Sequence, residues 1–328
     1  VFDLTQVNQL FLDQFPTGQN LRVEYYRTLS DAQLEQNEIL PQFDYNNETP
    51  FSQIIFVRVE SDDNGDCYGI GPHLTLTVHP KPEFDIDDTS IYCIDGDPII
   101  LETFNPDDIY SYEWTDESGT LISIDQTATV ASGGIYTVQA TSVYGCQSDT
   151  ESFNVVESAM ADIGLDDITI VDFSDNNTIT INNANNNLGI GDYEFSLDDA
   201  NGLYQDEPYF ENVGAGIHDL YVRDKNGCGV FGLEIFVLGF PKYFTPNGDS
   251  YNDTWNLKGW NDLFTQASRI YIYDRYGKFI KELAPWSQGW NGQFNGYELG
   301  TTDFWFTAEL IEQDGTTRIL KGHFSLIR

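Results

Sequence analysis

Short segments of alternating apolar and polar residues recur along the chain, and polar turns separate them. Three pairs of such segments share one arrangement, in which the turn contains Gly followed by Cys67, Cys146 or Cys228. Alternation with a period of two residues predicts half-buried strands, so each pair is predicted to be the last hairpin of a small β-sandwich. The spacings of 79 and 82 residues between the Cys positions predict a tandem array with one such hairpin per module.

Two aromatic residues of the second repeat are typical of immunoglobulin-like folds. Trp114 lies in the alternating segment 112–115, where these folds bury a Trp. Tyr136 lies in the segment 134–138 and is placed like the Tyr of a tyrosine corner. The second repeat is therefore predicted to have an Ig-like topology.

Helix is expected only near the start of the chain. Apolar residues recur with helical spacing over residues 4–14, and residues 30–33 have the form of a capping box. The predicted fold class is therefore all-β, with tandem Ig-like β-sandwich modules and a β-sandwich at the end. The predicted boundaries are 1–82 (Ig-like, lacking its first strand), 83–159 (Ig- or PKD-like), 160–239 (Ig-like) and 240–328.

The charge of the chain excludes two classes of partner. It has 53 Asp and Glu against 15 Lys and Arg, a formal net charge of −38, and a field of this sign repels nucleic acid and anionic lipid. No apolar segment is long enough to span a bilayer. The chain begins Val-Phe-Asp without Met, so we expect a processed or C-terminal part of a longer, secreted protein.

The last quarter of the chain has a different composition, with frequent Lys, Arg and Trp and without Cys. It is predicted to form six or seven strands, with tight turns at Arg275–Lys278 and Asp314–Gly315. Its sequence motifs are 243–255 (YFTPNGDSYNDTW), 270–278 (IYIYDRYGK), 289–292 (GWNG), 303–306 (DFWF) and 321–328 (KGHFSLIR).

In their order and amino-acid sequence these motifs closely resemble those of the gliding-motility-associated C-terminal domain of Bacteroidetes, the type B sorting domain of the type IX secretion system. The resemblance covers residues 241–328 and departs from the usual pattern at Ser250, Asn291 and Ile327. It assigns the sorting role to Phe244, Thr245, Pro246, Asn247, Gly248, Asp249, Asn252, Asp253, Asp274, Arg275, Tyr276, Gly277, Trp290, Gly292, Trp305, Lys321, Gly322, His323, Phe324 and Arg328.

The resemblance also implies partners and a location. It implies export through the type IX translocon, with outer-membrane barrel proteins of the PorV and PorP/SprF kind as partners, and exposure on the outer-membrane surface. Family members are typically large repeat proteins, including the gliding adhesin SprB. We therefore expect the C-terminal region of a secreted surface adhesin that functions in gliding motility, with the non-catalytic tail of an upstream enzyme as an alternative.

Four oxygen-bearing residues of the loop 245–253 form a candidate calcium site. Asn247, Asp249, Asn252 and Asp253 carry the hard ligands that Ca²⁺ prefers, although their spacing is not that of an EF-hand. The alternative is a turn in which these side chains bond their own backbone, as Asn and Asp commonly do. No other cofactor is expected.

The four Cys residues allow one disulfide bond within a module. Cys93 opens the second module and Cys146 lies in its last hairpin, so a Cys93–Cys146 disulfide is predicted to join the first strand to the last. The partner of Cys67 is expected on a preceding segment, and Cys228 has no evident partner. The Cys residues are too dispersed for a zinc site.

Nothing in the sequence predicts an enzyme. The four His residues lie in different modules and outside any catalytic motif. A second functional alternative is an adhesive tip that binds a surface glycan or protein, because exposed aromatic rings can stack on sugars. Its candidate residues are Tyr25, Tyr26, Tyr110, Tyr112 and Tyr209, for which packing within the modules is the competing role.

Overall fold

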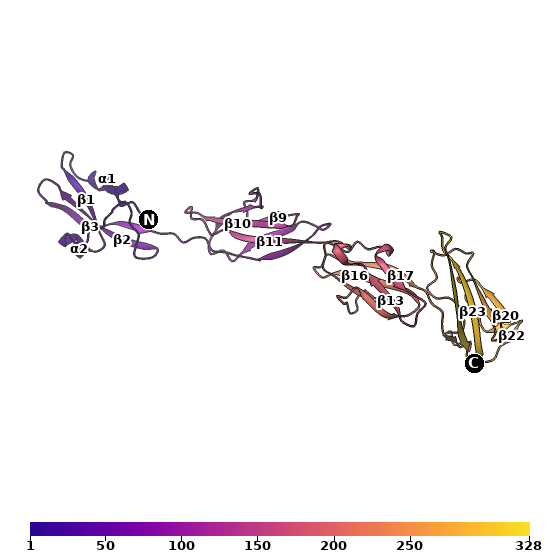
Figure 1. Cartoon of the computed structure of the whole chain (residues 1–328). Coiled ribbons are helices and arrows are strands. Elements are labelled where there is room, and N and C mark those ends of the chain that lie inside the picture. The colour runs from indigo at the N-terminus through magenta and orange to yellow at the C-terminus, as the bar shows by residue number, and fades with distance from the viewer. The chain divides into compact units, whose positions relative to one another are not determined.

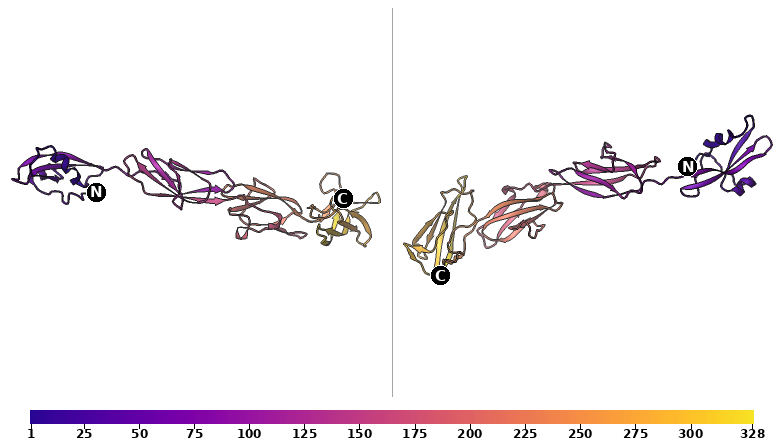
Figure 2. Two further views of the ribbon diagram at one scale, coloured as in Figure 1. Left: turned by 90° about the horizontal axis from the view of Figure 1, so that it is seen from above. Right: turned by 180° about the vertical axis from the view of Figure 1, so that it is seen from behind.

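The computed structural model describes residues 1–328, except for the side chain of Tyr68. Strands dominate, and the two α-helices are both short and near the N-terminus (Figures 1 and 2). The chain divides into two compact units, one of Val1–Asp88, Ile100–Thr129 and Ile135–Phe153, the other of Thr89–Ile99, Val130–Gly134 and Asn154–Arg328. None of the described helices is long and apolar enough to cross a membrane.

Residues 1–82 form one antiparallel sheet with short helices. Its strands, in order across the sheet, are β1 (Leu21–Tyr26), β2 (Ser52–Ser61) and β3 (Cys67–Thr77), and the helices are α1 (Asn8–Leu12), which follows a 3-10 turn at Leu4–Val7, and α2 (Leu29–Leu34).

The structure confirms helix within residues 4–14. Two details of this module differ from the prediction: it has a single sheet rather than the two sheets of an Ig-like sandwich, and α2 has another cap. Leu4 and Phe11 pack on Tyr25 and Ile55, so the helical segment covers the sheet face that a second sheet covers in an Ig-like sandwich. The cap of α2 is Thr28, whose hydroxyl accepts a hydrogen bond from the amide of Asp31 at 3.1 Å, rather than the predicted Ser30.

Residues 83–159 form two sheets, as an Ig-like module requires. One has the order β5-β11-β10-β7-β8 and the other β4-β6-β9. The strands are β4 (Asp85–Ile86), β5 (Thr89–Cys93), β6 (Ile99–Phe104), β7 (Tyr110–Thr115), β8 (Leu121–Ser123), β9 (Thr127–Val130), β10 (Gly134–Ser142) and β11 (Glu151–Ser158). Trp114 on β7 is fully buried, which confirms its predicted place in the core.

Residues 160–239 form two three-stranded sheets around a largely aliphatic core. Their orders are β12-β13-β15 and β14-β16-β17. The strands are β12 (Ile168–Val171), β13 (Asn177–Ile181), β14 (Tyr193–Leu197), β15 (Tyr209–Val213), β16 (Gly216–Asp224) and β17 (Val230–Val237).

Residues 240–328, called the C-terminal module below, are built on a five-stranded sheet of order β18-β24-β23-β19-β20. The strands of this module are β18 (Tyr243–Phe244), β19 (Arg269–Tyr273), β20 (Phe279–Leu283), β21 (Gln293–Phe294), β22 (Tyr297–Glu298), β23 (Thr302–Ile311) and β24 (Thr317–Leu326). Strand β18 pairs parallel with the end of β24, and the other pairs of this sheet are antiparallel. The predicted turns at 275–278 and 314–315 connect β19 to β20 and β23 to β24.

Candidate functional site in the C-terminal module

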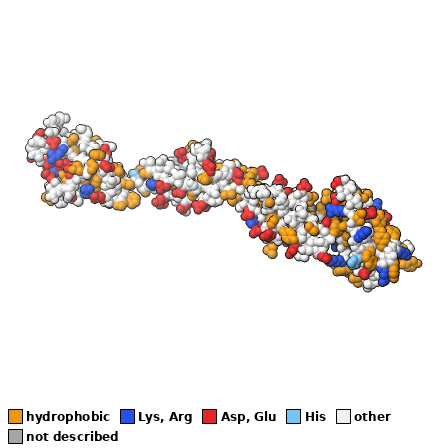
Figure 3. Space-filling view, viewed as in Figure 1, with side chains coloured by type: hydrophobic (Ala, Val, Ile, Leu, Met, Phe, Trp, Pro, Cys, Tyr) orange, Lys and Arg blue, Asp and Glu red, His pale blue; other side chains and the backbone are white. Residues whose placement is uncertain are grey.

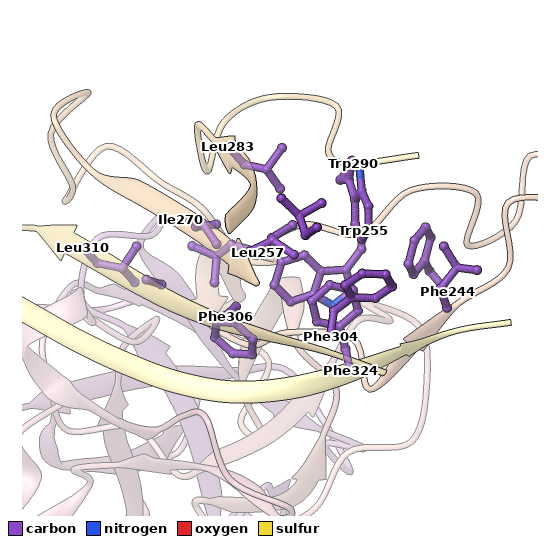
Figure 4. Packing of buried hydrophobic residues seen from close by; sticks show 14 of the residues in the cluster. Phe244, Trp255, Leu257, Ile270, Leu283, Trp290, Phe304, Phe306, Leu310 and Phe324 are labelled. Carbon is purple, nitrogen blue, oxygen red and sulfur yellow. The ribbon is translucent and has the colours of Figure 1, made fainter. Parts of the chain in front are cut away.

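Aromatic side chains fill the core of the C-terminal module (Figure 4). The ring of Trp255 stacks on Phe324 with centroids 3.8 Å apart, and Trp290 meets the ring of Phe304 edge-on at 4.8 Å. Phe244 on β18 packs against both Trp290 and Phe324. The motif residues Phe244, Trp290 and Phe324 are therefore core residues, which build the domain and are not available to touch a partner.

Each buried indole N–H has a backbone acceptor. Trp255 Nε1 donates to the carbonyl oxygen of Pro241 and Trp290 Nε1 to that of Gln293, both at 2.8 Å. A buried indole N–H without a partner would be costly. These two bonds also tie the connecting segments at Pro241 and Gln293 to the core.

The loop 245–253 is closed around the carboxylate of Asp253. Its two oxygens accept hydrogen bonds from the amides of Gly248 and Ser250, each at 2.7 Å. Gly248, Ser250 and Asn252 all have positive φ angles, of 82°, 71° and 54°. Ser250 stands where the family pattern has Gly, and its left-handed backbone explains that preference.

Three of the four calcium candidates in this loop, Asn247, Asp249 and Asp253, already have hydrogen-bonding partners for their side chains. Asp249 accepts from the amide of Tyr251 at 2.8 Å, which lowers the pKa of the Asp249 carboxyl. Asn247 accepts from the amide of Asp249 at 3.1 Å. Among the described residues, no group of three or more His, Cys, Asp and Glu could hold a metal ion. Calcium binding by the two Asn and two Asp residues stays a prediction.

The DRYG motif is the turn of the β19–β20 hairpin. Oδ1 of Asp274 accepts hydrogen bonds from the amides of Tyr276 and Lys278 at 2.8 and 2.9 Å, and Gly277 has a φ of 80°. Asp274 and Gly277 thus fix the turn. The other two motif residues, Arg275 and Tyr276, are not required by its geometry.

Two motif glycines lie where a side chain would collide with the core. A Cβ on Gly292 would be 2.4 Å from the side chain of Leu326, and one on Gly322 would be 2.7 Å from the ring of Phe306. Both residues therefore serve the packing of the aromatic core against the strands.

Arg328 holds the end of the chain against two neighbouring loops. Its guanidinium lies 2.9 Å from the carboxylate of Glu298 and donates to the carbonyl oxygens of Leu299 and Pro246. Its amide donates to the hydroxyl of Thr301 at 3.0 Å. No motif marks Glu298 or Thr301, so the sequence carried no signal for these partners.

The strand directions bring the motif loops to one end of the sheet. Phe244 pairs with Leu326, and Leu326 pairs with Thr302. The segments that follow β18 and β24 and the one that precedes β23 therefore lie together. The β19–β20 turn is at this end too, because Tyr273, which precedes the turn, pairs with Trp305 near the start of β23.

Five exposed motif residues have no role in the core, in closing the loop 245–253 or in fixing the end of the chain. They are Arg275, Tyr276, Trp305, Lys321 and His323. Tyr276 is 85% exposed and Trp305 is 43% exposed, and Trp305 lies opposite His323 across strands β23 and β24. Exposed hydrophobic and basic side chains gather over this module, whereas Asp and Glu stand out over the others (Figure 3). A partner can reach these five residues, and the structure gives them no other task.

The predicted Cys93–Cys146 disulfide is wrong, because the structure joins Cys93 to Cys228, with Cα atoms 5.4 Å apart. Strand β5 runs parallel to β11, and Cys93 lies beside Ser158 at the end of that strand. Cys146 precedes β11, whose eight residues span roughly 25 Å, far beyond the reach of a disulfide. Cys67 and Cys146 are free.

Three of the five tyrosines proposed to bind glycan belong to module cores. Tyr25, Tyr26 and Tyr112 are at most 6% exposed, whereas Tyr209 is 42% exposed. Tyr110 is half-buried. The buried rings cannot stack on a sugar, so that part of the prediction is wrong, and a glycan ligand stays a prediction for the remaining two.

The four His residues do not converge on one site. His73 lies in β3, His218 in β16 and His323 in β24, and His79 stacks on Tyr144 with ring centroids 3.5 Å apart. His218 has structural partners, with Nδ1 2.8 Å from the carboxylate of Asp198. The expectation that the chain is not an enzyme stays a prediction.

Comparison with known families identifies both ends of the chain. Residues 238–326 match the CHU_C type IX secretion signal domain. The C-terminal module is a type IX secretion signal domain. The match supports export of the chain as a secreted protein and agrees with the resemblance of its five motifs. Residues 1–82 match the Flavobacterium inter-domain disulphide bond domain, which is also consistent with a sorting-domain protein of Bacteroidetes.

Solved structures similar to the chain come from tandem β-modules. They include fibronectin(III)-like modules of Clostridium thermocellum CbhA (17% identity, 48% of this chain and 94% of that one, TM-score 0.28). Others are a tetra-tandem repeat in the extending region of a large adhesion protein (13%, 94% and 92%, 0.24) and a Ca²⁺-stabilised ice-binding adhesin of an Antarctic bacterium (10%, 95% and 91%, 0.26). These likenesses are too distant to inform function. No curated protein matches the chain.

Proposed function

We propose that the chain is the C-terminal region of a large cell-surface adhesin, delivered to the outer-membrane surface by its type IX secretion signal domain. The observation that carries this proposal is the match of residues 238–326 to that domain. The role in gliding motility is part of the proposal and follows from the resemblance of the motifs.

The exposed motif residues support direct contact between the sorting domain and the exporter. Core packing and turn geometry account for most of the motif, but not for Tyr276 or Lys321, which are exposed. The partners proposed are outer-membrane barrel proteins of the PorV and PorP/SprF kind. Residues 240–328 hold nine of the 15 basic and ten of the 53 acidic residues, so this module lacks the strong negative charge that repels anionic surfaces.

The repeats before the sorting domain are proposed to be non-catalytic spacers or adhesive units. Their carboxylates are spread over many turns, and their His residues lie in separate modules. A disulfide joins Cys93 to Cys228, as suits a protein exposed to an oxidising exterior. The exposed Tyr209 is a candidate for weak binding of a glycan or a protein.

A truncation tests export. The chain is fused behind a secretory leader and expressed in a host that has a type IX system, and its amounts in the periplasm and outside the cell are measured. Ending the chain at Glu312 removes β24, and we expect the protein to remain inside. Deletion of residues 1–82 removes a larger part of the chain, a whole module outside the sorting domain, and is expected to leave export unchanged. Normal export of the chain that ends at Glu312 would refute the proposal.

A second experiment shows whether the truncated chain stays inside because it misfolds or because it has lost the sorting signal. Residues 238–328 are attached to the C-terminus of a periplasmic fluorescent protein, which by itself stays in the periplasm. The fusion should appear outside the cell in the same host and should remain periplasmic in a strain without the translocon.

A further inference from the structure

Strand β24 is long, regular and paired along its full length on only one side. Its ten residues pair with β23 from Thr317 to Leu326 without a register shift. On the other side it meets β18, which has two residues and pairs only with Ser325 and Leu326. Most of β24 is therefore the edge of the sheet.

The backbone groups along this edge have a known direction. The amides of Ser325 and Ile327 donate toward β18, to the carbonyl oxygens of Lys242 and Phe244 at 2.9 and 3.1 Å. Because alternate residues of a strand point their amides the same way, those of Ile319, Lys321 and His323 point outward beyond the end of β18. Within the described part of the chain, no second strand receives them.

This edge lacks most of the features that normally prevent pairing with another strand. Natural edges are usually short, bulged, interrupted by Pro or marked by charges. The opposite edge, β20, has five residues and a register irregularity against β19. In contrast, β24 is regular, contains no Pro and exposes 61% of Ile319. Lys321 is its one protective charge outside the end residue Arg318, which is bonded to Glu312.

Among the described residues, Lys321 is a cation of this edge without a carboxylate partner, whereas Lys242 and Arg318 are paired. Lys321 and His323 alternate along β24 and so share one face of the sheet, and Lys242 lies beside β18. The carboxylates nearby are Asp303, which is hydrogen-bonded to Ser325, and the exposed Asp175, which is paired with Lys242. Two more are Glu309, which lies opposite Ile319 on β23, and Asp172, which is 3.8 Å from Arg318. A hollow of about 1130 Å³ lies between this edge and residues 173–177 and 213–215 of the preceding module, and its lining includes Lys242, Lys321 and His323. It is large enough for several residues of an extended peptide.

We propose that the open edge of β24 accepts an added strand from the export machinery, an extended segment with Asp or Glu at alternate positions. Main-chain bonds to Ile319, Lys321 and His323 would give affinity, and carboxylates beside Lys321 and His323 would give specificity. The inference rests on the proposed function, since it names the surface by which the exporter reads the sorting domain.

Three variants of the full chain test the edge. Lys321→Pro removes the outward amide without touching the ladder to β23, Lys321→Glu keeps the backbone and reverses the charge, and Lys321→Ala keeps the backbone and removes the charge. We expect export to fall at least tenfold for Lys321→Pro and Lys321→Glu and two- to fivefold for Lys321→Ala. Thermal unfolding checks that each variant is folded. If Lys321→Pro does not fold, the export of Lys321→Glu decides whether the edge is used.

Hydrogen exchange provides the direct measurement. In the free chain the amides of residues 319, 321 and 323 should exchange quickly. In the chain captured on outer-membrane vesicles from a type IX host they should become protected, and Lys321→Pro should not be captured. Vesicles from a strain without the translocon are the control.

The outcomes separate this inference from the proposed function. Folded Lys321→Pro and Lys321→Glu chains that are exported like the parent would overturn strand addition and leave the sorting role intact. Export of a chain lacking residues 238–328 would refute the sorting role itself. Dimers in sedimentation that Lys321→Pro abolishes would assign the edge to a second copy of the chain and overturn the proposed occupant.

Discussion

The module of residues 160–239 and the C-terminal module are both small β-structures, yet different interactions stabilise them. The core of the former is mainly aliphatic, around Ile179, Leu220 and Val222. It adds a buried carboxylate, Asp224, which accepts from the amide of Cys228 at 3.1 Å, and the disulfide from Cys228. The C-terminal module has no Cys and relies on stacked aromatic rings.

The two regions also differ in charge. Residues 240–328 carry a formal charge of −1, and residues 1–239 carry −37. Mutual repulsion keeps an acidic array soluble but opposes compact association, so a covalent link is useful between neighbouring modules. The comparison indicates that a disulfide joins the acidic repeats, whereas the last module relies on its aromatic core, against which Phe173 of the preceding module also packs.

The largest expected effect comes from the aromatic core. Trp255→Ala removes a fully buried indole that stacks on Phe324, and replacement of a buried Trp by Ala typically costs about 3–5 kcal/mol. We expect this loss in the free energy of unfolding of the C-terminal module, measured by urea denaturation, together with loss of export. Trp305→Ala is the matched control, because that ring is 43% exposed, and its effect should stay under about 1 kcal/mol. Equal losses for both variants would contradict the account of the core.

The next effect concerns the disulfide. Cys228→Ser opens the link to Cys93, and loss of a native disulfide typically costs about 2–5 kcal/mol. The unfolding transition of residues 160–239 should move to lower urea under non-reducing conditions, and that of the C-terminal module should not. Cys146→Ser removes a free thiol and should leave both transitions in place. If Cys146→Ser produced the shift and Cys228→Ser did not, the pairing in the structure would be wrong.

Sequence periodicity predicted the strands and turns well, because alternation and turn residues act locally. The hairpin at residues 274–278 and the burial of Trp114 are examples. The disulfide could not be predicted, because it depends on β5 running parallel to β11, a long-range pairing that no local pattern encodes. The partners of Arg328 are similar, since Glu298 and Thr301 meet it only after the strands have brought three loops to one end.

A smaller effect is expected where Ser250 departs from the family pattern. Its φ of 71° is favourable for Gly and strained for Ser. Ser250→Gly should therefore stabilise the C-terminal module by up to about 1 kcal/mol, the gain being reduced by the greater freedom of Gly in the unfolded chain. Asn247→Gly is the control, since Asn247 has no positive φ and its side chain bonds Asp249, so that variant should destabilise. A loss of stability for Ser250→Gly would show that the loop is not strained.

The smallest expected effect is that of calcium on the same loop. The carboxylate of Asp253 accepts two backbone amides and that of Asp249 accepts one, so a cation would have to compete with bonds that already close the turn. We expect the melting temperature of the C-terminal module to change by less than about 1 °C between millimolar Ca²⁺ and excess chelator. Asp253→Asn tests the same point from the protein side, because it weakens the two amide bonds and should lower the melting temperature equally with and without Ca²⁺. If Ca²⁺ raised the melting temperature by several degrees and Asp253→Asn abolished the rise, the loop would be a metal site and the C-terminal module would not be stabilised by its own chain alone.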